Sequence, residues 1–178
     1  MTHPRLVAQA RLETPLGPMT AAASAEGLAG LWFDGQAHHP GPLVVPTQPG
    51  HRWLKAADLA LARYFSGDAD PLRDLPLDLH GTPFQRAVWR ALRALPRGHA
   101  STYAAIAGQA GSPAAVRAAG AAIGRNPVSV LVPCHRVLGA SGALTGYAGG
   151  LDRKRALLRL EDVALPGAAA PRQSEGSP

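Results

Sequence analysis

Alternation of apolar and polar side chains dominates the start of the chain. Residues 6–12 alternate with a period of two, which predicts a half-buried strand. The Pro-Leu-Gly-Pro segment at residues 15–18 has the composition of a turn, and residues 19–24 and 28–33 follow as two further strands. The pattern therefore predicts a small meander of strands.

A helical period replaces the strand period after a loop at residues 36–50 that is rich in proline, glycine and histidine. Residues 53–65 repeat apolar side chains at helical spacing, and a Ser-Gly pair directly after them supplies a stop signal. Residues 68–80 show neither period and are predicted to be a linker.

A second helix is predicted from Thr82, which can cap free amides, and Pro83, which suits the first turn of a helix. The apolar period runs to about Leu95 and gives the helix a face directed at a core. Arginines recur at helical spacing on another side: Arg86, Arg90, Arg93 and Arg97. Such a stripe is more often solvated than functional.

Two short helices, at residues 102–110 and 114–123, flank a turn at residues 111–113 and have the outline of a helix-turn-helix. The second consists almost entirely of alanine and glycine, with Arg117 as its one long side chain. Such a surface cannot read base edges in the major groove, but it can lie in the minor groove without choosing a sequence. A buried, alanine-rich packing helix would fit this composition equally well.

Charge is distributed unevenly along the chain. Residues 1–81 have a net charge of −2 and residues 82–165 of +8, within a total of +6. No carboxylate occurs between Asp78 and Asp152, whereas seven arginines do. A genome that favours arginine codons would explain the arginines but not the missing acids. We therefore expect this half to present a positive face to a polyanion.

Length and cysteine content restrict the class of protein. A chain of 178 residues can form one compact unit or two small domains. No apolar stretch of about 18 residues predicts a membrane span and no signal-peptide core follows Met1, so we expect a cytoplasmic protein. The single cysteine, Cys134, cannot form an internal disulfide or a thiolate-rich zinc site. It is either inert filler or a reagent.

The neighbours of Cys134 favour a reagent. A short apolar run at residues 128–132 and Pro133 precede it, which places the thiol at the end of a rigid element. His135 and Arg136 follow directly, and an imidazole and a cation are the groups that generate a nucleophilic thiolate. Adjacent residues need not touch in space, so this pairing is a hypothesis about geometry.

These residues resemble the active-site signature of the O6-alkylguanine-DNA alkyltransferases. The signature is Pro-Cys-His-Arg-Val at residues 133–137, preceded by Asn126-Pro127 and followed by Gly146-Tyr147 and Gly-Gly-Leu at residues 149–151. Further matching segments lie at residues 81–85, 88–89, 101–103, 117–120 and 157–161. The resemblance covers residues 81–161 almost without gaps, and the segments 14–17 and 26–28 match the family's variable N-terminal domain less specifically.

The resemblance implies an α+β fold. Residues 1–80 are expected to form a small N-terminal α/β domain, ribonuclease H-like, that ends in the linker. Residues 81–164 are expected to form a mostly helical, winged-helix-like domain that holds the helix-turn-helix and the cysteine. Residues 165–178, rich in Pro, Gly, Ala and Ser, are predicted to be a disordered tail.

The resemblance also implies catalytic roles. Cys134 corresponds to the alkyl acceptor, His135 to the base that takes its proton through a water, and Glu161 to the carboxylate that orients His135. Asn126 corresponds to the hinge that ties the recognition helix to the active-site turn. Tyr103 corresponds to the residue whose hydroxyl reaches N3 of the extruded guanine.

Two further groups of residues follow from the same resemblance. Arg117 corresponds to a finger that fills the space left by the extruded nucleotide. Other residues expected at the DNA are Ala118, Arg125, Arg136 and Thr102. Residues expected in the substrate pocket are Tyr147, Ala148, Val137 and Trp89. Ala148 replaces the Ser or Gly of many relatives, with little expected effect because the family contact there comes from the backbone.

The implied function is DNA repair by a stoichiometric methylated-DNA-[protein]-cysteine S-methyltransferase. Such a protein flips O6-alkylguanine, and also O4-alkylthymine, out of duplex DNA and moves the alkyl group irreversibly to Cys134. The thioether is not hydrolysed, so the protein is consumed in a single turnover. We expect a monomer that binds double-stranded DNA through the minor groove with little sequence preference, without a cofactor or metal.

Two positions bear on the details. Ser129 lies at a pocket edge that varies among relatives, which leaves the range of accepted alkyl groups open. Some relatives bind zinc through N-terminal cysteines and histidines, but the one cysteine here is already assigned. His38, His39 and His51 are therefore expected to be loop residues.

Two other functions would use some of the same residues. A Cys-His hydrolase or acyltransferase could use Cys134, His135 and Glu161 as a triad, but it would not explain the basic second half. A non-catalytic protein that binds alkylated DNA would explain the charge. The presence of Cys134 argues against it.

Overall fold

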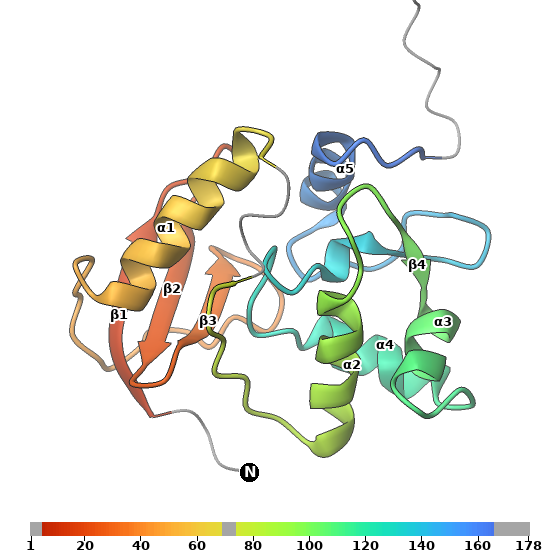
Figure 1. Cartoon of the computed structure of the whole chain (residues 1–178), viewed down its shortest axis with the longest axis horizontal. Helices are drawn as coiled ribbons and strands as arrows, with labels where there is room; N and C mark the ends of the chain where they lie inside the picture. The colour runs from red at the N-terminus through yellow and green to blue at the C-terminus, as the bar shows by residue number, and fades with distance from the viewer. Residues whose placement is uncertain (1–4, 69–73, 166–178) are drawn as a thin grey trace, which may run out of the picture.

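A computed structural model describes residues 5–68 and 74–165 and shows a three-stranded sheet beside a group of helices (Figure 1). The sheet and one helix come from the first 65 residues, and the remaining helices come from residue 83 onward. The mixed α and β class is therefore as expected. The predicted tail lies outside the described residues, except for Leu165. Within the described part of the chain, no helix is long and apolar enough to cross a membrane.

The sheet is the predicted meander. Strands β1 (Leu6–Leu12), β2 (Met19–Ser24) and β3 (Leu28–Phe33) pair antiparallel in the order β1-β2-β3. Burial alternates along much of β1, whereas β2 and β3 are almost entirely buried. Helix α1 (Arg52–Phe65) packs against all three strands, as its apolar face predicted.

The edge of β3 is covered by two segments from later in the chain. The amide of Leu31 donates to the carbonyl of Pro127 at 2.9 Å, and the amide of Ser129 donates to the carbonyl of Leu31 at 2.8 Å. At the start of β3, the amide of Leu28 donates to the carbonyl of Pro76 at 2.9 Å. Residues 76–78 of the predicted linker thus lie beside β3, and the segment that leads to Cys134 is anchored to the sheet.

Helix α2 (Pro83–Arg93) begins where the sequence predicted it. The hydroxyl of Thr82 accepts from the amide of Gln85 at 3.2 Å, and the side-chain oxygen of Gln85 accepts from the amide of Thr82 at 2.9 Å. This reciprocal capping box satisfies two amides that the first turn leaves free. Arg86 and Arg90 lie exposed on the outer face.

The helix-turn-helix consists of α3 (Tyr103–Gln109) and α4 (Val116–Gly124), which pack on each other and on α2. The buried side of α4 contains Ala119, Ala122 and Ile123. The exposed side contains Arg117, Ala118 and Ala121. The alanine-rich helix is therefore both a packing helix and a smooth exposed surface, one on each side.

The apolar run before Cys134 is a buried turn rather than a regular strand. The amide of Val132 donates to the carbonyl of Val128 at 3.0 Å, and Val130 has a φ of 71°. Strands β4 (Ser101–Thr102) and β5 (Val137–Leu138) pair in parallel just after it. This pairing brings the start of α3 close to the active-site segment. Helix α5 (Leu151–Leu160) follows.

Candidate active site

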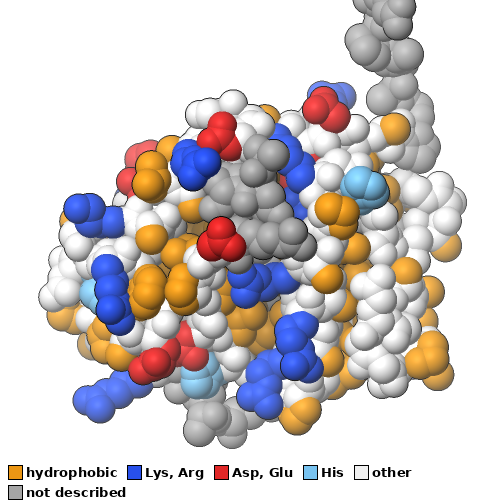
Figure 2. Space-filling model, in the orientation of Figure 1, with side chains coloured by type: hydrophobic (Ala, Val, Ile, Leu, Met, Phe, Trp, Pro, Cys, Tyr) orange, Lys and Arg blue, Asp and Glu red, His pale blue; other side chains and the backbone are white. Residues whose placement is uncertain are grey.

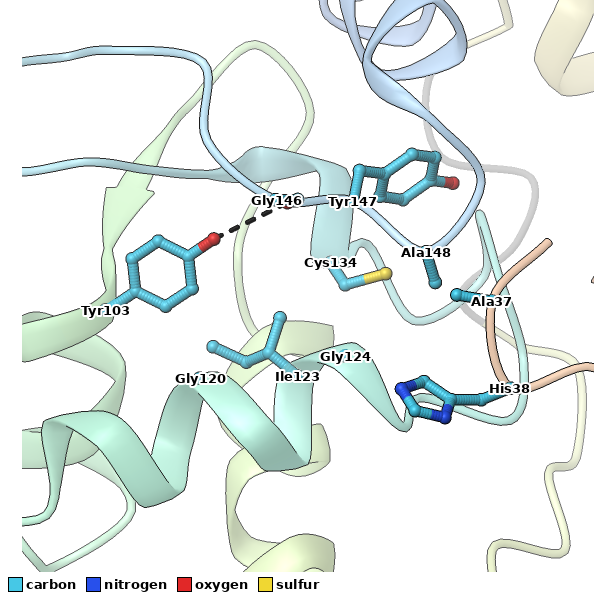
Figure 3. A pocket seen from close by; sticks show the side chains of 10 residues that line it. All are labelled: Ala37, His38, Tyr103, Gly120, Ile123, Gly124, Cys134, Gly146, Tyr147 and Ala148. Atoms are coloured by element: carbon cyan, nitrogen blue, oxygen red, sulfur yellow. Dashed lines mark hydrogen bonds between the residues drawn. The ribbon is translucent and has the colours of Figure 1, made fainter.

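Cys134 begins a short 3₁₀ turn, Cys134–Arg136, and lines a pocket of about 220 Å³ (Figure 3). The thiol is 3% exposed, so a reactant must enter the pocket to reach it. The pocket walls come from four parts of the chain: the loop after β3, the start of α3, the C-terminal half of α4, and the loop before α5. The lining residues are Ala37, His38, Tyr103, Gly120, Ile123, Gly124, Cys134, Gly146, Tyr147 and Ala148.

Asn126 holds the turn that carries the thiol. Its Nδ2 donates to the carbonyl of Val132 at 2.7 Å and to Sγ of Cys134 at 3.1 Å, while its Oδ1 accepts from the amide of Val128 at 3.0 Å. One buried side chain thus fixes the two ends of the turn and contacts the reactive sulfur. Asn126 lies between α4 and the turn that carries Cys134, and its hinge role stays a prediction.

The surroundings of Cys134 favour the protonated thiol. Burial raises the pKa of Cys134, and the hydrogen bond from Asn126 and the charge of Lys154 only partly oppose this rise. The acidifying effect that the sequence suggested for the neighbouring imidazole and guanidinium is therefore outweighed by desolvation. A base must remove the proton before the sulfur can act as a strong nucleophile.

His135 and Glu161 form a fully buried pair next to Cys134. Nε2 of His135 lies 2.9 Å from Oε1 of Glu161, and both side chains have no exposed surface. Burial lowers the pKa of His135 although Glu161 opposes this change, so the imidazole is neutral. With Nε2 donating to Glu161, Nδ1 carries the lone pair, and it has no hydrogen-bond partner among the described residues. His135 is thus a neutral base with a free acceptor nitrogen.

Glu161 is the centre of a larger polar cluster. Its Oε2 accepts from Nε of Arg136 at 2.7 Å, and its Oε1 accepts from Nη2 of Arg136 at 2.9 Å and from the hydroxyl of Tyr64 at 2.6 Å. Burial opposes ionisation of Glu161, but the hydrogen bonds from His135 and Arg136 outweigh burial and lower its pKa. The carboxylate therefore stays charged beside the neutral imidazole.

The pocket wall beyond the thiol is built by two tyrosines. Tyr103 is partly exposed, and its hydroxyl lies 3.5 Å from the carbonyls of Thr145 and Gly146. The ring of Tyr147 meets that of His135 edge to face, with centroids 6.4 Å apart. A Cβ on Gly149 would lie 2.6 Å from the Tyr147 ring, so only glycine permits this ring position. Ala148 lines the same wall.

Lys154 is a buried polar residue that the sequence analysis did not single out. Its Nζ donates to the carbonyls of Val137 at 2.5 Å, Thr145 at 2.6 Å and Gly146 at 3.3 Å. Burial lowers its pKa to about 8. The ammonium thus ties β5 to the loop that forms one pocket wall. Its spacing from Leu157 and Leu158 on α5 places it on an apolar helix face, which is the signal that could have found it.

Several expected DNA contacts are exposed. Arg117 and Ala118 lie on the outer side of α4, and Arg125 follows its last turn. The helix runs past the pocket, since Gly120, Ile123 and Gly124 line it (Figure 3). The hydroxyl of Thr102 accepts from the amide of Ala105 at 3.2 Å and caps α3.

Three expected site residues lie elsewhere. Arg136 is 5% exposed and its guanidinium is bound to Glu161 and to the carbonyl of Leu95, so the structure contradicts its expected place at the DNA. Trp89 and Val137 are buried and do not line the pocket. Trp89 instead donates to the carbonyl of Ala122 at 2.9 Å and so secures α2 to α4. These three residues therefore lie in the layer of the structure that surrounds the pocket.

A buried thiol at the end of a pocket, a neutral base and a helix-turn-helix beside the opening define a DNA-directed enzyme that uses a cysteine. Residues 83–163 match the family described as 6-O-methylguanine DNA methyltransferase, DNA binding domain. The methylated-DNA–protein-cysteine methyltransferase of Mycobacterium tuberculosis H37Rv is 45% identical over 155 residues, covering 87% of this chain and 92% of the relative. The Salmonella typhimurium protein of the same name is 51% identical over 122 residues, or 68% of each chain.

A solved structure agrees with these sequence relatives. The crystal structure of Mycobacterium tuberculosis OGT in complex with DNA superposes with a TM-score of 0.79 at 44% identity, covering 88% of this chain and 93% of that one. The chain belongs to the methylated-DNA–protein-cysteine methyltransferases, a family of DNA-binding repair enzymes. The resemblance that the sequence suggested is thereby confirmed. The hydrolase and the non-catalytic binder are set aside.

Proposed function

We propose that this enzyme extrudes O6-alkylguanine, and also O4-alkylthymine, from duplex DNA and takes the alkyl group onto Cys134 in a single turnover. The observation that carries the proposal is the position of the thiol. Cys134 lines a pocket whose size suits a single base, and Nδ1 of the adjacent His135 has no hydrogen-bond partner among the described residues. A stacked base could not reach a thiol that is 3% exposed, so the nucleotide has to leave the stack.

Removal of the thiol proton uses the buried pair. We propose that a water links Sγ to Nδ1 of His135, which takes the proton as the sulfur attacks. Glu161, which is charged and accepts from Nε2, stabilises the imidazolium that forms. Arg136 keeps Glu161 ionised and does not itself approach the substrate.

The transfer is a single displacement. The Cys134 sulfur forms a bond to the alkyl carbon while the bond from that carbon to O6 breaks, and its electron pair stays on the guanine. The purine takes up one proton at N3, for which the Tyr103 hydroxyl is the proposed donor, and leaves as neutral guanine. The product is a thioether, and neither His135 nor Glu161 can hydrolyse a carbon–sulfur bond. Each chain therefore reacts once.

The DNA is proposed to lie along the exposed side of α4. Arg117 precedes Gly120, a pocket residue, by one helical turn, so its side chain can occupy the gap that the extruded nucleotide leaves. The small side chains around it permit close approach to the minor groove without base-specific contacts. Figure 2 shows arginine or lysine and no acidic side chain on the surface over α2, which suits a phosphate backbone.

Other features of the protein are proposed on the same basis. We propose a monomer in the cytoplasm, with a ribonuclease H-like unit at residues 1–80 and a winged-helix-like unit at residues 81–164. The anchoring of Pro127 and Ser129 to β3 supports a fixed relation between the two units.

Duplex DNA that carries a labelled methyl group on O6 of one guanine tests the proposal. Transfer predicts that the label moves to protein and stops at one methyl per chain. Label that stays on bound DNA, or is released to solvent, would contradict it. Unmodified duplex of the same sequence serves as the control for binding.

A further inference from the structure

The first part of the chain contributes directly to the pocket. Ala37 and His38 follow β3, yet both line the cavity that contains Cys134 (Figure 3). The sequence predicts that His38 is a loop residue, and in the structure its side chain is exposed. Its position at the rim of the pocket could not be seen from the sequence. The resemblance to the alkyltransferases rests mainly on residues 81–161, which do not include this loop.

The loop is held in place by contacts to both sides of the active site. The buried Oε1 of Gln36 accepts from the amide of Phe33 at 2.9 Å and from the hydroxyl of Ser129 at 3.0 Å. The amide of Ala37 donates to the carbonyl of Ala148 at 2.8 Å. His38, with a φ of 60°, is thus presented by a loop bonded to the turn before Cys134 and to the pocket wall.

The thiol points toward this loop. In Figure 3, Tyr103 and His38 lie on opposite sides of Cys134, and Sγ is directed to the side where Ala37 and Ala148 meet. A base that contacts Tyr103 would place O6 and its first carbon near the sulfur. In a displacement, the attacking and leaving atoms lie in line, so any substituent on that carbon projects sideways. On the His38 side it meets the methyl groups of Ala37 and Ala148 and the imidazole.

Ser129 does not fill this role. It is 1% exposed, does not line the pocket, and its hydroxyl is bonded to Gln36. Ala37 and Ala148 are too short to cover a large substituent. We infer that His38 forms the wall that contacts alkyl groups larger than methyl, and that it thereby determines how well bulky O6 adducts are repaired. The inference rests on the proposed transfer to Cys134.

The test compares transfer from duplexes that carry O6-benzylguanine or O6-methylguanine, using the full chain. His38→Asn removes the ring while retaining a residue type that tolerates positive φ. It is expected to lower the benzyl rate constant about three- to tenfold more than the methyl one, the effect of losing one aromatic contact. His38→Tyr, which restores a ring, is expected to recover most of the benzyl rate.

His39→Asn is the matched control, because its ring packs edge to face on Trp32 and is not part of the pocket. It should leave the benzyl-to-methyl ratio unchanged. An unchanged or increased ratio in His38→Asn, an equal fall of both rates, or the same fall in His39→Asn would overturn the inference. If the wild-type chain transferred neither group, the proposed function itself would fail.

Discussion

The two sides of the pocket differ in how their polar side chains are partnered. On the inner side, the side chains of His135, Arg136 and Glu161 are buried, and hydrogen bonds of 2.7–2.9 Å join them. On the outer side of α4, Arg117 and Arg125 are exposed beside small side chains. Desolvation and hydrogen bonds together set the proton affinities of the inner cluster, whereas the outer surface is free to meet phosphates. Substitutions inside should affect transfer and stability, and those outside should affect the handling of DNA.

Cys134→Ala should separate the two sides most completely. Loss of the sulfur removes the acceptor, so transfer of labelled methyl is expected to fall to zero, while affinity for duplex DNA is retained because phosphate contacts come from other residues. Fluorescence anisotropy with labelled duplex measures the affinity. Binding that disappears together with transfer would mean that Cys134 supports the fold.

Glu161→Gln should show the strength of the inner cluster. It leaves the Arg136 guanidinium buried without a counter-charge, and we expect a loss of about 3–5 kcal/mol in the free energy of unfolding. Asp162→Asn is the control, since Asp162 is adjacent but exposed and has a φ of 57° that asparagine tolerates. Denaturant titration measures both variants. Equal losses in the two would contradict the cluster's role.

The pH dependence of stability should change in the same variant. The folded pKa of Glu161 lies below its unfolded value of about 4.3, so ionised Glu161 stabilises the fold above that pH. The contribution is lost as the pH falls from about 4.3 toward the folded pKa. Wild-type protein should therefore lose stability more steeply than Glu161→Gln on acidification below about pH 5. Parallel curves for the two proteins would show that Glu161 is not preferentially ionised in the fold.

Lys154→Met should weaken the link between β5 and the pocket loop. Three carbonyls lose their donor, and we expect a loss of about 1–3 kcal/mol in the free energy of unfolding. Arg155→Met is the control on the same helix, because the one polar partner of Arg155 among the described residues is exposed Asp152, in an ion pair of 3.1 Å. Thermal unfolding compares them. A loss of stability no larger than that of Arg155→Met would show that the Lys154 hydrogen bonds do not stabilise the fold.

Arg117→Ala tests the outer surface. If Arg117 fills the gap in the duplex, repair of O6-methylguanine within duplex DNA should slow about tenfold. Slowing of this size corresponds to a fraction of the few kcal/mol that extrusion of a nucleotide costs. Transfer from free O6-benzylguanine, which needs no extrusion, should change little. Single-turnover kinetics at saturating DNA measure the first rate. Equal slowing on both substrates would show that Arg117 supports the pocket or the fold instead.

Arg125→Ala should give the smallest effect. Loss of one phosphate contact is expected to weaken binding to all sequences alike and to reduce the slope of log affinity against log salt by about 1. Arg63→Ala, on α1 and paired with Asp68 at 2.8 Å, is the control. An identical salt slope in Arg125→Ala and wild type would exclude Arg125 from the interface.

The sequence predicted the parts of the fold that depend on local patterns. The alternation with a period of two predicted β1, and Thr82 with Pro83 predicted the start of α2. Both signals depend only on residues a few positions apart in the sequence. The sequence predicted that His135 and Arg136 would lower the pKa of the adjacent Cys134 thiol. In the 3₁₀ turn Cys134 instead lines the pocket, while His135 and Arg136 both reach Glu161.

The remaining features depend on contacts between distant segments. Trp89 and Val137 belong to the matching motifs, but motif membership does not distinguish a pocket wall from the layer that supports it. His38 reaches the pocket only because Gln36 and Ala37 bond to segments about 90 and 110 residues later. Lys154 is a basic residue like its partly exposed neighbours Arg153 and Arg155. Only its position on the buried face of the helix distinguishes it from them.

Transfer to Cys134 in a single turnover is tested by locating and counting the methyl groups on the protein. Wild-type protein is incubated with excess duplex that carries O6-methylguanine, digested, and mapped by mass spectrometry over a time course. A single transfer to Cys134 predicts one added methyl group per chain, on the peptide that contains Cys134, with a plateau that more DNA does not raise. A methyl group on another residue, or repair that continues beyond one guanine per chain, would contradict it.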